Sequence, residues 1–213
     1  MAATSEIPLA QQQHLVLSHV GWEFYERVLE EIGNRQIRIT YFDGTIEIMS
    51  PLLKHELAKC AIGRLIETLT YILDINLLPA GSTTFRRRDK SAGLEPDECY
   101  YLKNAAVVRG MERFDPKKFP PPDLAIEVDI TSRSIPRQPI YAALGVPELW
   151  RFDGKNLEVT ILGKNGYVRA ESSIAFPFLK MDQFSQFVNR LLNEDSVIVL
   201  KDFRKWVASL TRS

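Results

Sequence analysis

The sequence predicts an α+β (α/β-like) fold, with one central mixed sheet flanked by helices and a β-hairpin near the N-terminus. Two stretches, "IRITYFDGTIEIMS" and "PPDLAIEVDITS", alternate apolar and polar residues, a pattern typical of half-buried strands. A third stretch, "LKHELAKCAIGRLIETLTYIL", spaces its apolar residues at helical intervals. Helices and strands mixed in this way along one chain favour a sheet covered by helices.

The N-terminal half begins with a predicted amphipathic helix over residues 22–32, "WEFYERVLEEI". Asp43-Gly44 then separates two alternating runs, and this dipeptide is a strong signal for a two-residue hairpin turn. After Pro51 the spacing predicts a helix of about five turns. Its apolar positions are Leu57, Ile62, Leu65, Ile66, Leu69 and Leu73.

The C-terminal half alternates strands with shorter helices. "STTFRRRD" and "EPDECYYLKN" are predicted strands, and a polar, proline-punctuated loop leads to the strand in "PPDLAIEVDITS". "IPRQPIYAALG" predicts a short helix with Pro139 near its first turn and Gly145 at its end. "PELWRFDG" predicts a strand, "NLEVTILGKNGYVRAESS" a hairpin, and the tail two helices.

The composition favours an ordinary globular protein, with all of residues 1–213 in one domain. Lys plus Arg and Asp plus Glu both number 27, which argues against an extended, sequence-blind polyanion binder. Cys60 and Cys99 form no CxxC motif and are predicted to be buried thiols, which indicates a reducing cytoplasm. No signal peptide is indicated, and no run of about 18 apolar residues predicts a membrane span.

Three carboxylates, those of Asp123, Glu127 and Asp129, share one face of the strand in "PPDLAIEVDITS". Glu127 and Asp129 are about 6.6 Å apart along it, whereas Asp123 is about 13 Å from Glu127 and is interpreted as a strand-entry residue. Asp97 in "EPDECYYL" can converge with Glu127 if their strands are neighbours. Carboxylates from neighbouring strands are the oxygen ligands that Mg²⁺ prefers.

Five motifs occur in the order of a known family: "GTIEIMSP", "KHE" opening a helix, "EPDECYYL", "PPDLAIEVDITSRS" and "IYAALGVPELWRFDG". Over residues 21–179, which we take as the core, the chain resembles the Uma family of bacterial "putative restriction endonucleases", long catalogued as a domain of unknown function. The C-terminal helices, residues 182–213, are less diagnostic. The resemblance implies the restriction-endonuclease-like fold of the PD-(D/E)XK nuclease superfamily.

The resemblance also implies a set of site residues. Asp97 and Glu127 would bind Mg²⁺ (or Mn²⁺). The lysine expected two residues after Glu127 is Asp129 here, which would be a second or more distant ligand. The basic residue is instead Arg137, four residues before Tyr141, and Arg137 would stabilise the scissile phosphate.

The other candidate site residues each have two possible interpretations. His55 and Glu56 open the long helix and either join the site or are first-turn residues that favour the helix dipole. Glu47 either contributes an acid or is a solvated strand residue. The run "FRRRDK" either contacts phosphates or is a solvated strand end balanced by acids.

The function implied by the resemblance is a Mg²⁺-dependent endonuclease that hydrolyses phosphodiester bonds in DNA, acting in the cytoplasm. A homodimer is expected because duplex cutters often pair two active sites. The alternative is a catalytically degenerate nuclease-fold protein that works as a nucleic-acid or protein interaction module. The neutral charge and the missing lysine favour that alternative.

Overall fold

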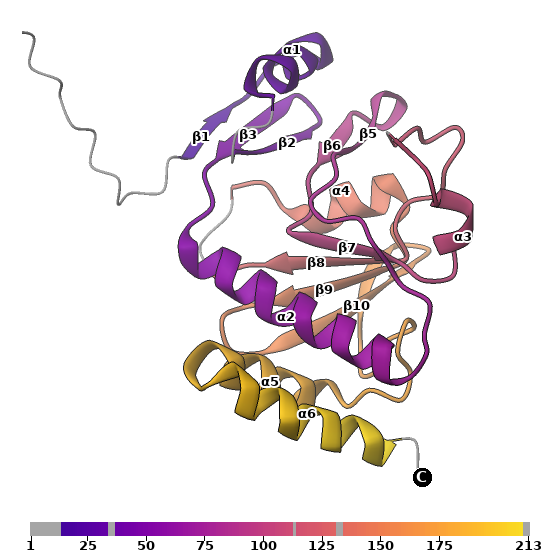
Figure 1. The fold of residues 1–213 in the computed structure, drawn as a ribbon. Helices are drawn as coiled ribbons and strands as arrows, with labels where there is room; N and C mark the ends of the chain where they lie inside the picture. The colour runs from indigo at the N-terminus through magenta and orange to yellow at the C-terminus, as the bar shows by residue number, and fades with distance from the viewer. Residues whose placement is uncertain (1–13, 34–36, 113, 131–133, 211–213) are drawn as a thin grey trace, which may run out of the picture.

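A computed structural model describes residues 14–33, 37–112, 114–130 and 134–210, and its strands form two sheets (Figure 1). The small sheet is antiparallel, in the order β1 (His14–Leu17), β3 (Thr45–Met49), β2 (Arg38–Phe42), β6 (Ala92–Leu94), β5 (Phe85–Arg87). The large sheet has the order β11 (Gly166–Ala170), β10 (Leu157–Gly163), β9 (Glu148–Phe152), β8 (Leu124–Val128), β7 (Glu98–Tyr101), β4 (Leu78–Pro79). It is mixed, because β8 and β9 are parallel while its other pairs are antiparallel.

Helices cover both sheets. They are α1 (Trp22–Ile32), α2 (Leu53–Ile72), α3 (Ala105–Val108), α4 (Arg137–Leu144), α5 (Met181–Asn193) and α6 (Ser196–Leu210), with a single 3₁₀ turn, η1 (Arg88–Lys90), after β5. In Figure 1, α1 lies on the small sheet, while α2, α5 and α6 lie on one face of the large sheet. The predicted fold class, α+β with a central mixed sheet flanked by helices and an N-terminal hairpin, is confirmed.

Local signals identified most of these elements. Asp43 and Gly44 both have positive φ, 43° and 77°. A two-residue hairpin turn requires positive φ at both positions, because this conformation matches the twist of the two strands. Gly145 ends α4 in the left-handed conformation, where a glycine has no steric penalty. The strands β1, β4 and β6 and the one-turn helix α3 were not predicted, because elements of two to four residues show no periodicity.

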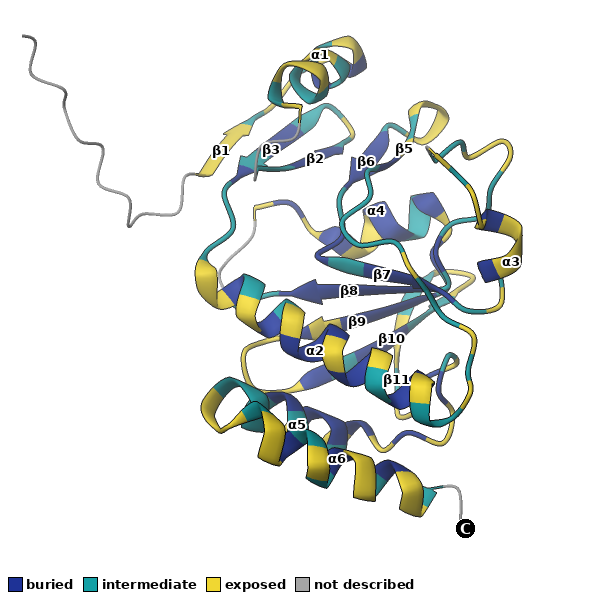
Figure 2. Ribbon diagram, in the orientation of Figure 1, coloured by how far each residue is buried: buried dark blue, intermediate teal, exposed yellow. Residues whose placement is uncertain are grey.

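The expectation of one sheet needs a correction, because the hairpin β2–β3 joins β1, β5 and β6 in a separate sheet. The two sheets meet at α4, whose buried side chains share one apolar core with residues of both, including Phe85, Leu94, Cys99 and Leu149. A second core joins α2, α5 and α6 to the large sheet, and a third joins α1 to the small sheet. Figure 2 shows the central strands of the large sheet buried.

Three details of the prediction are settled at the level of single side chains. Leu57, counted among the apolar positions of the long helix, is exposed. Cys99 is buried as predicted, but the prediction for Cys60 is wrong because this thiol is on the surface.

Among the described residues, no helix combines the length and the apolar character that a membrane span requires.

Candidate functional site

The two acids predicted to converge lie at the same end of the strand pair β7–β8. β7 and β8 are antiparallel with Glu98 opposite Ile126, so Asp97, one residue before β7, is in register with Glu127. Side chains of directly opposed residues in an antiparallel pair point to the same side of the sheet. Asp97 and Glu127 are only 7% and 2% exposed.

Asp97 is fixed by the backbone of the neighbouring strand. The amide of Val128 donates a hydrogen bond to Asp97 Oδ2 at 2.7 Å. The segment from Glu95 to Asp97 is also the connection between β6 of the small sheet and β7 of the large sheet. Asp97 therefore lies where the two sheets meet.

Glu127 is fixed by helix α4. The hydroxyl of Tyr141 donates to Glu127 Oε1 at 2.5 Å, and Tyr141 itself is 1% exposed. Burial raises the pKa of Tyr141 well above its usual value, and the charge of Glu127 raises it further. Tyr141 therefore remains protonated and acts as a permanent hydrogen-bond donor to Glu127.

Arg137 lies one turn before Tyr141 on the same face of α4. Its Nη2 donates to Glu47 Oε2 at 2.8 Å, which joins α4 to strand β3 of the small sheet. Its Nε and Nη1 are buried and have no hydrogen-bond partner among the described residues. Buried donors of this kind require an acceptor, such as a water or an anion.

Glu47 is the group that sequence reasoning undervalued. It is 1% exposed, so its interpretation as a solvated strand residue is wrong. Besides Arg137 it accepts hydrogen bonds from the backbone amide of Ser134 and from His14 Nε2, both at 3.0 Å. Burial alone would raise the pKa of Glu47, but Arg137 and these two hydrogen bonds outweigh burial and lower it.

The signal for Glu47 was present but ambiguous. Alternation in β3 correctly assigned Glu47 to the face opposite Ile46 and Ile48. Nothing local to β3 shows that this opposite face is also covered, because Ser134 and Arg137 are 87 and 90 residues away in sequence.

Asp129 is more exposed than the two acids and contacts the neighbouring strand β9. It follows the end of β8, its side chain is 25% exposed, and its Oδ2 lies 3.5 Å from Nη1 of Arg151. Arg151 is on β9, in register beside Glu127. The position where the superfamily has its lysine therefore holds a carboxylate paired with an arginine from the next strand.

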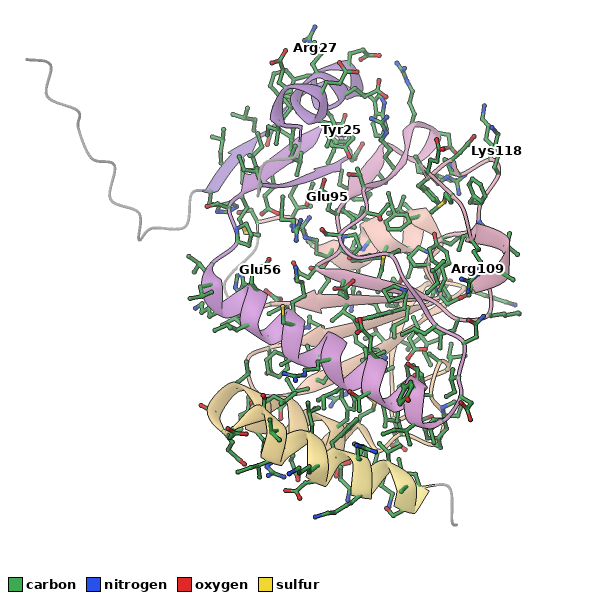
Figure 3. All side chains as sticks on the ribbon, in the orientation of Figure 1. Tyr25, Arg27, Glu56, Glu95, Arg109 and Lys118 are labelled. Atoms are coloured by element: carbon green, nitrogen blue, oxygen red, sulfur yellow. The ribbon has the colours of Figure 1, made fainter. Side chains whose placement is uncertain are left out.

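His55 and Glu56 point into different surroundings. His55 is buried in the first turn of α2. Glu56 Oε2 lies 2.5 Å from Lys59 Nζ, and Glu56 Oε1 lies 3.8 Å from a nitrogen of Arg38. Glu56 lines a cavity of about 520 Å³ whose wall also includes Glu95 (Figure 3). The larger cavity of about 960 Å³, between β10, β11 and α5, is lined by none of the candidate site residues.

For Asp123 and for the basic run "FRRRDK", the contacts favour a structural interpretation over a role in the site. Asp123 accepts hydrogen bonds from the amides of Leu102 and Asn104, which confirms it as a strand-entry residue. Each arginine of the run "FRRRDK" is paired with an acid: Arg86 with Glu26 at 3.7 Å, Arg87 with Asp89 at 2.7 Å and Arg88 with Glu23. These pairs favour the balanced strand end over a phosphate-binding surface.

The donor set at the acid pair suits a hard divalent cation. Asp97 and Glu127 offer carboxylate oxygens, and Mg²⁺ is commonly bound by one or two carboxylates with waters and substrate phosphate completing its coordination. No cluster of three or more His, Cys, Asp or Glu side chains suited to a metal occurs within the described part of the chain. A cage made entirely of protein ligands is therefore not present there.

Comparisons with known proteins match this chain to a family model and to solved structures. Residues 22–187 match the model of the Uma2 family, whose description is "Putative restriction endonuclease". A solved structure described as a "putative nuclease belonging to DUF820" from Anabaena variabilis ATCC 29413 aligns with a TM-score of 0.46 and 13% sequence identity. The alignment covers 84% of this chain and 96% of that chain. No curated protein matches.

Proposed function

The chain belongs to the Uma2 family of restriction-endonuclease-like proteins, and from this premise we propose that it is a metal-dependent endonuclease that hydrolyses phosphodiester bonds in DNA. The observation that carries the proposal is the register of β7 and β8, which opposes Asp97 to Glu127 at the junction of the two sheets. Asp97 and Glu127 would hold Mg²⁺ or Mn²⁺. When bound, such an ion stabilises negative charge on the phosphoryl group and acidifies a water molecule.

The remaining residues have distinct roles in this proposal. Tyr141 holds one oxygen of Glu127 and so orients the carboxylate. Arg137, held by Glu47, would stabilise negative charge on the scissile phosphate through Nε and Nη1. Arginine stays protonated and is a poor general base, so the proton of the attacking water must leave to a carboxylate or to bulk solvent.

The test is cleavage of supercoiled plasmid by purified protein with Mg²⁺ or Mn²⁺. Asp97→Asn should lower the nicking rate about 100-fold or more, the scale expected when a group that stabilises charge in the transition state is lost. Asp115→Asn is the matched control, because the side chain of Asp115 contacts its sequence neighbours Lys117 and Lys118. Equal rates in wild type and Asp97→Asn, or no nicking with either metal, would refute the proposal. A parallel RNA substrate decides between DNA and RNA.

The second candidate function is a non-catalytic interaction module built on the same fold. The carboxylate at Asp129, where a lysine is expected, and the near-complete burial of both acids favour it. Calorimetric titration with Mn²⁺ distinguishes the two. Tight Mn²⁺ binding that is lost in Glu127→Ala supports the nuclease, and absence of binding supports the module.

A cytoplasmic homodimer completes the proposal. Duplex cutters often pair two active sites, and a two-fold dimer would supply them. Sedimentation equilibrium of the purified chain checks this directly, since a mass near twice 24.3 kDa is expected.

A further inference from the structure

The cavity beside the acid pair has an unusual lining. It opens between the end of α1, β2, the first turns of α2 and the segment 82–84, and it has a volume of about 520 Å³. That volume is within the range of about 300–1,000 Å³ that small-molecule sites occupy. Glu56 and Glu95, both labelled in Figure 3, line it. Glu95 is two residues before Asp97 in the chain, so the cavity is near the proposed catalytic site, although neither Asp97 nor Glu127 lines it.

Among the described residues, the cavity lining carries side chains of both signs. Arg38 and Lys59 are basic and Glu56 and Glu95 are acidic, and burial raises the pKa of Glu95. Lys59 is close to Glu56, whereas the guanidinium of Arg38 lies between the two carboxylates at 3.8 Å and 3.9 Å. These separations are too long for hydrogen bonds.

Arg38 is therefore held by charge without being saturated by hydrogen bonds. Its side chain is 15% exposed, and its Nε is buried without a hydrogen-bond partner among the described residues. Ser82, Thr83 and Thr84 also line the cavity, and the hydroxyl of Thr84 donates to Oε1 of Glu95 at 2.9 Å. The lining also includes aliphatic residues: Leu29, Ile32, Ile37, Ile39 and Pro51.

This lining selects a class of ligand. An anion such as a phosphate would meet two carboxylates, and a cation would meet Arg38 and Lys59. A neutral flat group that carries both acceptors and donors on its edge satisfies both kinds of side chain, and its faces can lie against the aliphatic residues. Nucleobases have these properties: arginine donates to base acceptors, and carboxylates accept from base amino groups.

We propose that this cavity binds one unstacked nucleobase of the nucleic-acid strand whose backbone lies at Asp97 and Glu127. The inference rests on the proposed function for the identity of the strand. Arg38 would donate to the acceptors of the base, and Glu56 and Glu95 would accept from its amino or imino groups. The protein would then read one base near the scissile bond by hydrogen bonding.

The test measures binding, in EDTA, of single-stranded DNA and RNA oligonucleotides that differ at one position: each of the four bases or an abasic site. Wild type should bind the abasic oligonucleotide about tenfold or more weakly than the best base. Arg38→Met should abolish that difference and leave the salt dependence of binding unchanged. Arg169→Met is the control, because Arg169 is on the edge strand β11 with its side chain 80% exposed, and it should behave as wild type.

Three results would overturn the inference: equal binding of abasic and intact oligonucleotides by wild type, no binding of any oligonucleotide, or an Arg38→Met variant that weakens all oligonucleotides equally. The last would come with a salt slope smaller by about 0.7 and would identify a phosphate contact. Ser82→Phe, which fills the cavity from a loop, should reproduce the loss of base dependence if Arg38→Met is poorly folded. Because no cleavage is measured, base-dependent binding without nicking would retain this inference while the nuclease proposal fails.

Discussion

Glu47 is a single buried acid that connects parts of the fold and also contacts Arg137, a candidate site residue. It is buried with three hydrogen-bond donors around it, one of them a guanidinium. Removing one partner of a buried ion pair leaves an uncompensated charge, which costs more than the pair contributes. Its contact with Arg137 uses Nη2, so that Nε and Nη1 of Arg137 are left without a hydrogen-bond partner among the described residues.

Glu47→Ala should therefore lower the free energy of unfolding by about 3–5 kcal/mol, the cost of isolating a buried charge. Urea denaturation followed by circular dichroism measures it. Glu158→Ala removes an acid that pairs with Arg151 and Arg169 at the surface, and it should cost about 1 kcal/mol or less. Similar losses for the two variants would contradict the role of Glu47.

Glu47 also predicts a pH dependence. Its pKa in the folded protein lies below the ordinary value of 4.5, so the stability it contributes is present above that value and is lost as pH falls through the lower folded pKa. The difference in unfolding free energy between wild type and Glu47→Gln should therefore be largest at neutral pH and should shrink below about pH 4.5. Denaturation series at several pH values check this, and a difference independent of pH would refute it.

Helix α4 is the element on which the site depends. It is only eight residues long, yet Arg137 contacts the small sheet through Glu47, and Tyr141 contacts the large sheet through Glu127. Residues four apart on a helix share a face, so one short helix contacts a buried acid of each sheet, Glu47 and Glu127, at the same time. The same helix contributes Ile140 and Leu144 to the apolar core between the sheets.

Packing of α1 on the small sheet gives an element-scale prediction. A Cβ at Gly93 of β6 would overlap the hydroxyl of Tyr25, and it would lie 2.8 Å and 3.0 Å from two ring carbons of Tyr25. Gly93→Ala should therefore destabilise the protein by about 1–3 kcal/mol. The Tyr25 hydroxyl is buried without a hydrogen-bond partner among the described residues, so Tyr25→Phe alone should be close to neutral.

Thermal unfolding of the single and double variants measures these effects. Tyr25→Phe should recover part of the loss caused by Gly93→Ala, because the hydroxyl is removed and the ring carbons stay. Strictly additive losses would contradict a direct contact between the two positions.

At the scale of the whole molecule, the C-terminal helices are packed into the large core. Phe184 and Val188 of α5 and Phe203 and Val207 of α6 share a core with buried residues of α2, β8 and β9. We therefore expect the chain to unfold as one cooperative unit, as the interpretation of residues 1–213 as a single domain requires.

Phe203→Ala should lower the unfolding free energy by about 3–5 kcal/mol, with one transition seen by both tryptophan fluorescence and circular dichroism. Val197→Ala on the exposed face of α6 should stay within about 0.5 kcal/mol of wild type. Two separate transitions, with only one shifted by Phe203→Ala, would show that the C-terminal helices form an independent unit.

The sequence alone determined the features that depend on neighbours along the chain. The helices α1 and α2, the hairpin turn at Asp43-Gly44 and the end of α4 at Gly145 follow from apolar periodicity and glycine stereochemistry. The sequence predicted that Asp97 and Glu127 lie close together only if their strands are neighbours, because the sequence of a strand does not show which strand pairs with it. The structure shows that β7 and β8 are paired.

The tertiary structure decided what depends on distant residues. It divided the strands between two sheets, buried Glu47, and paired it with Arg137, 90 residues away. It also placed Arg38 between Glu56 and Glu95. These three residues come from three separate segments of the chain. Alternation in a strand reports which side chains share a face, but what covers that face depends on the packing of the whole chain.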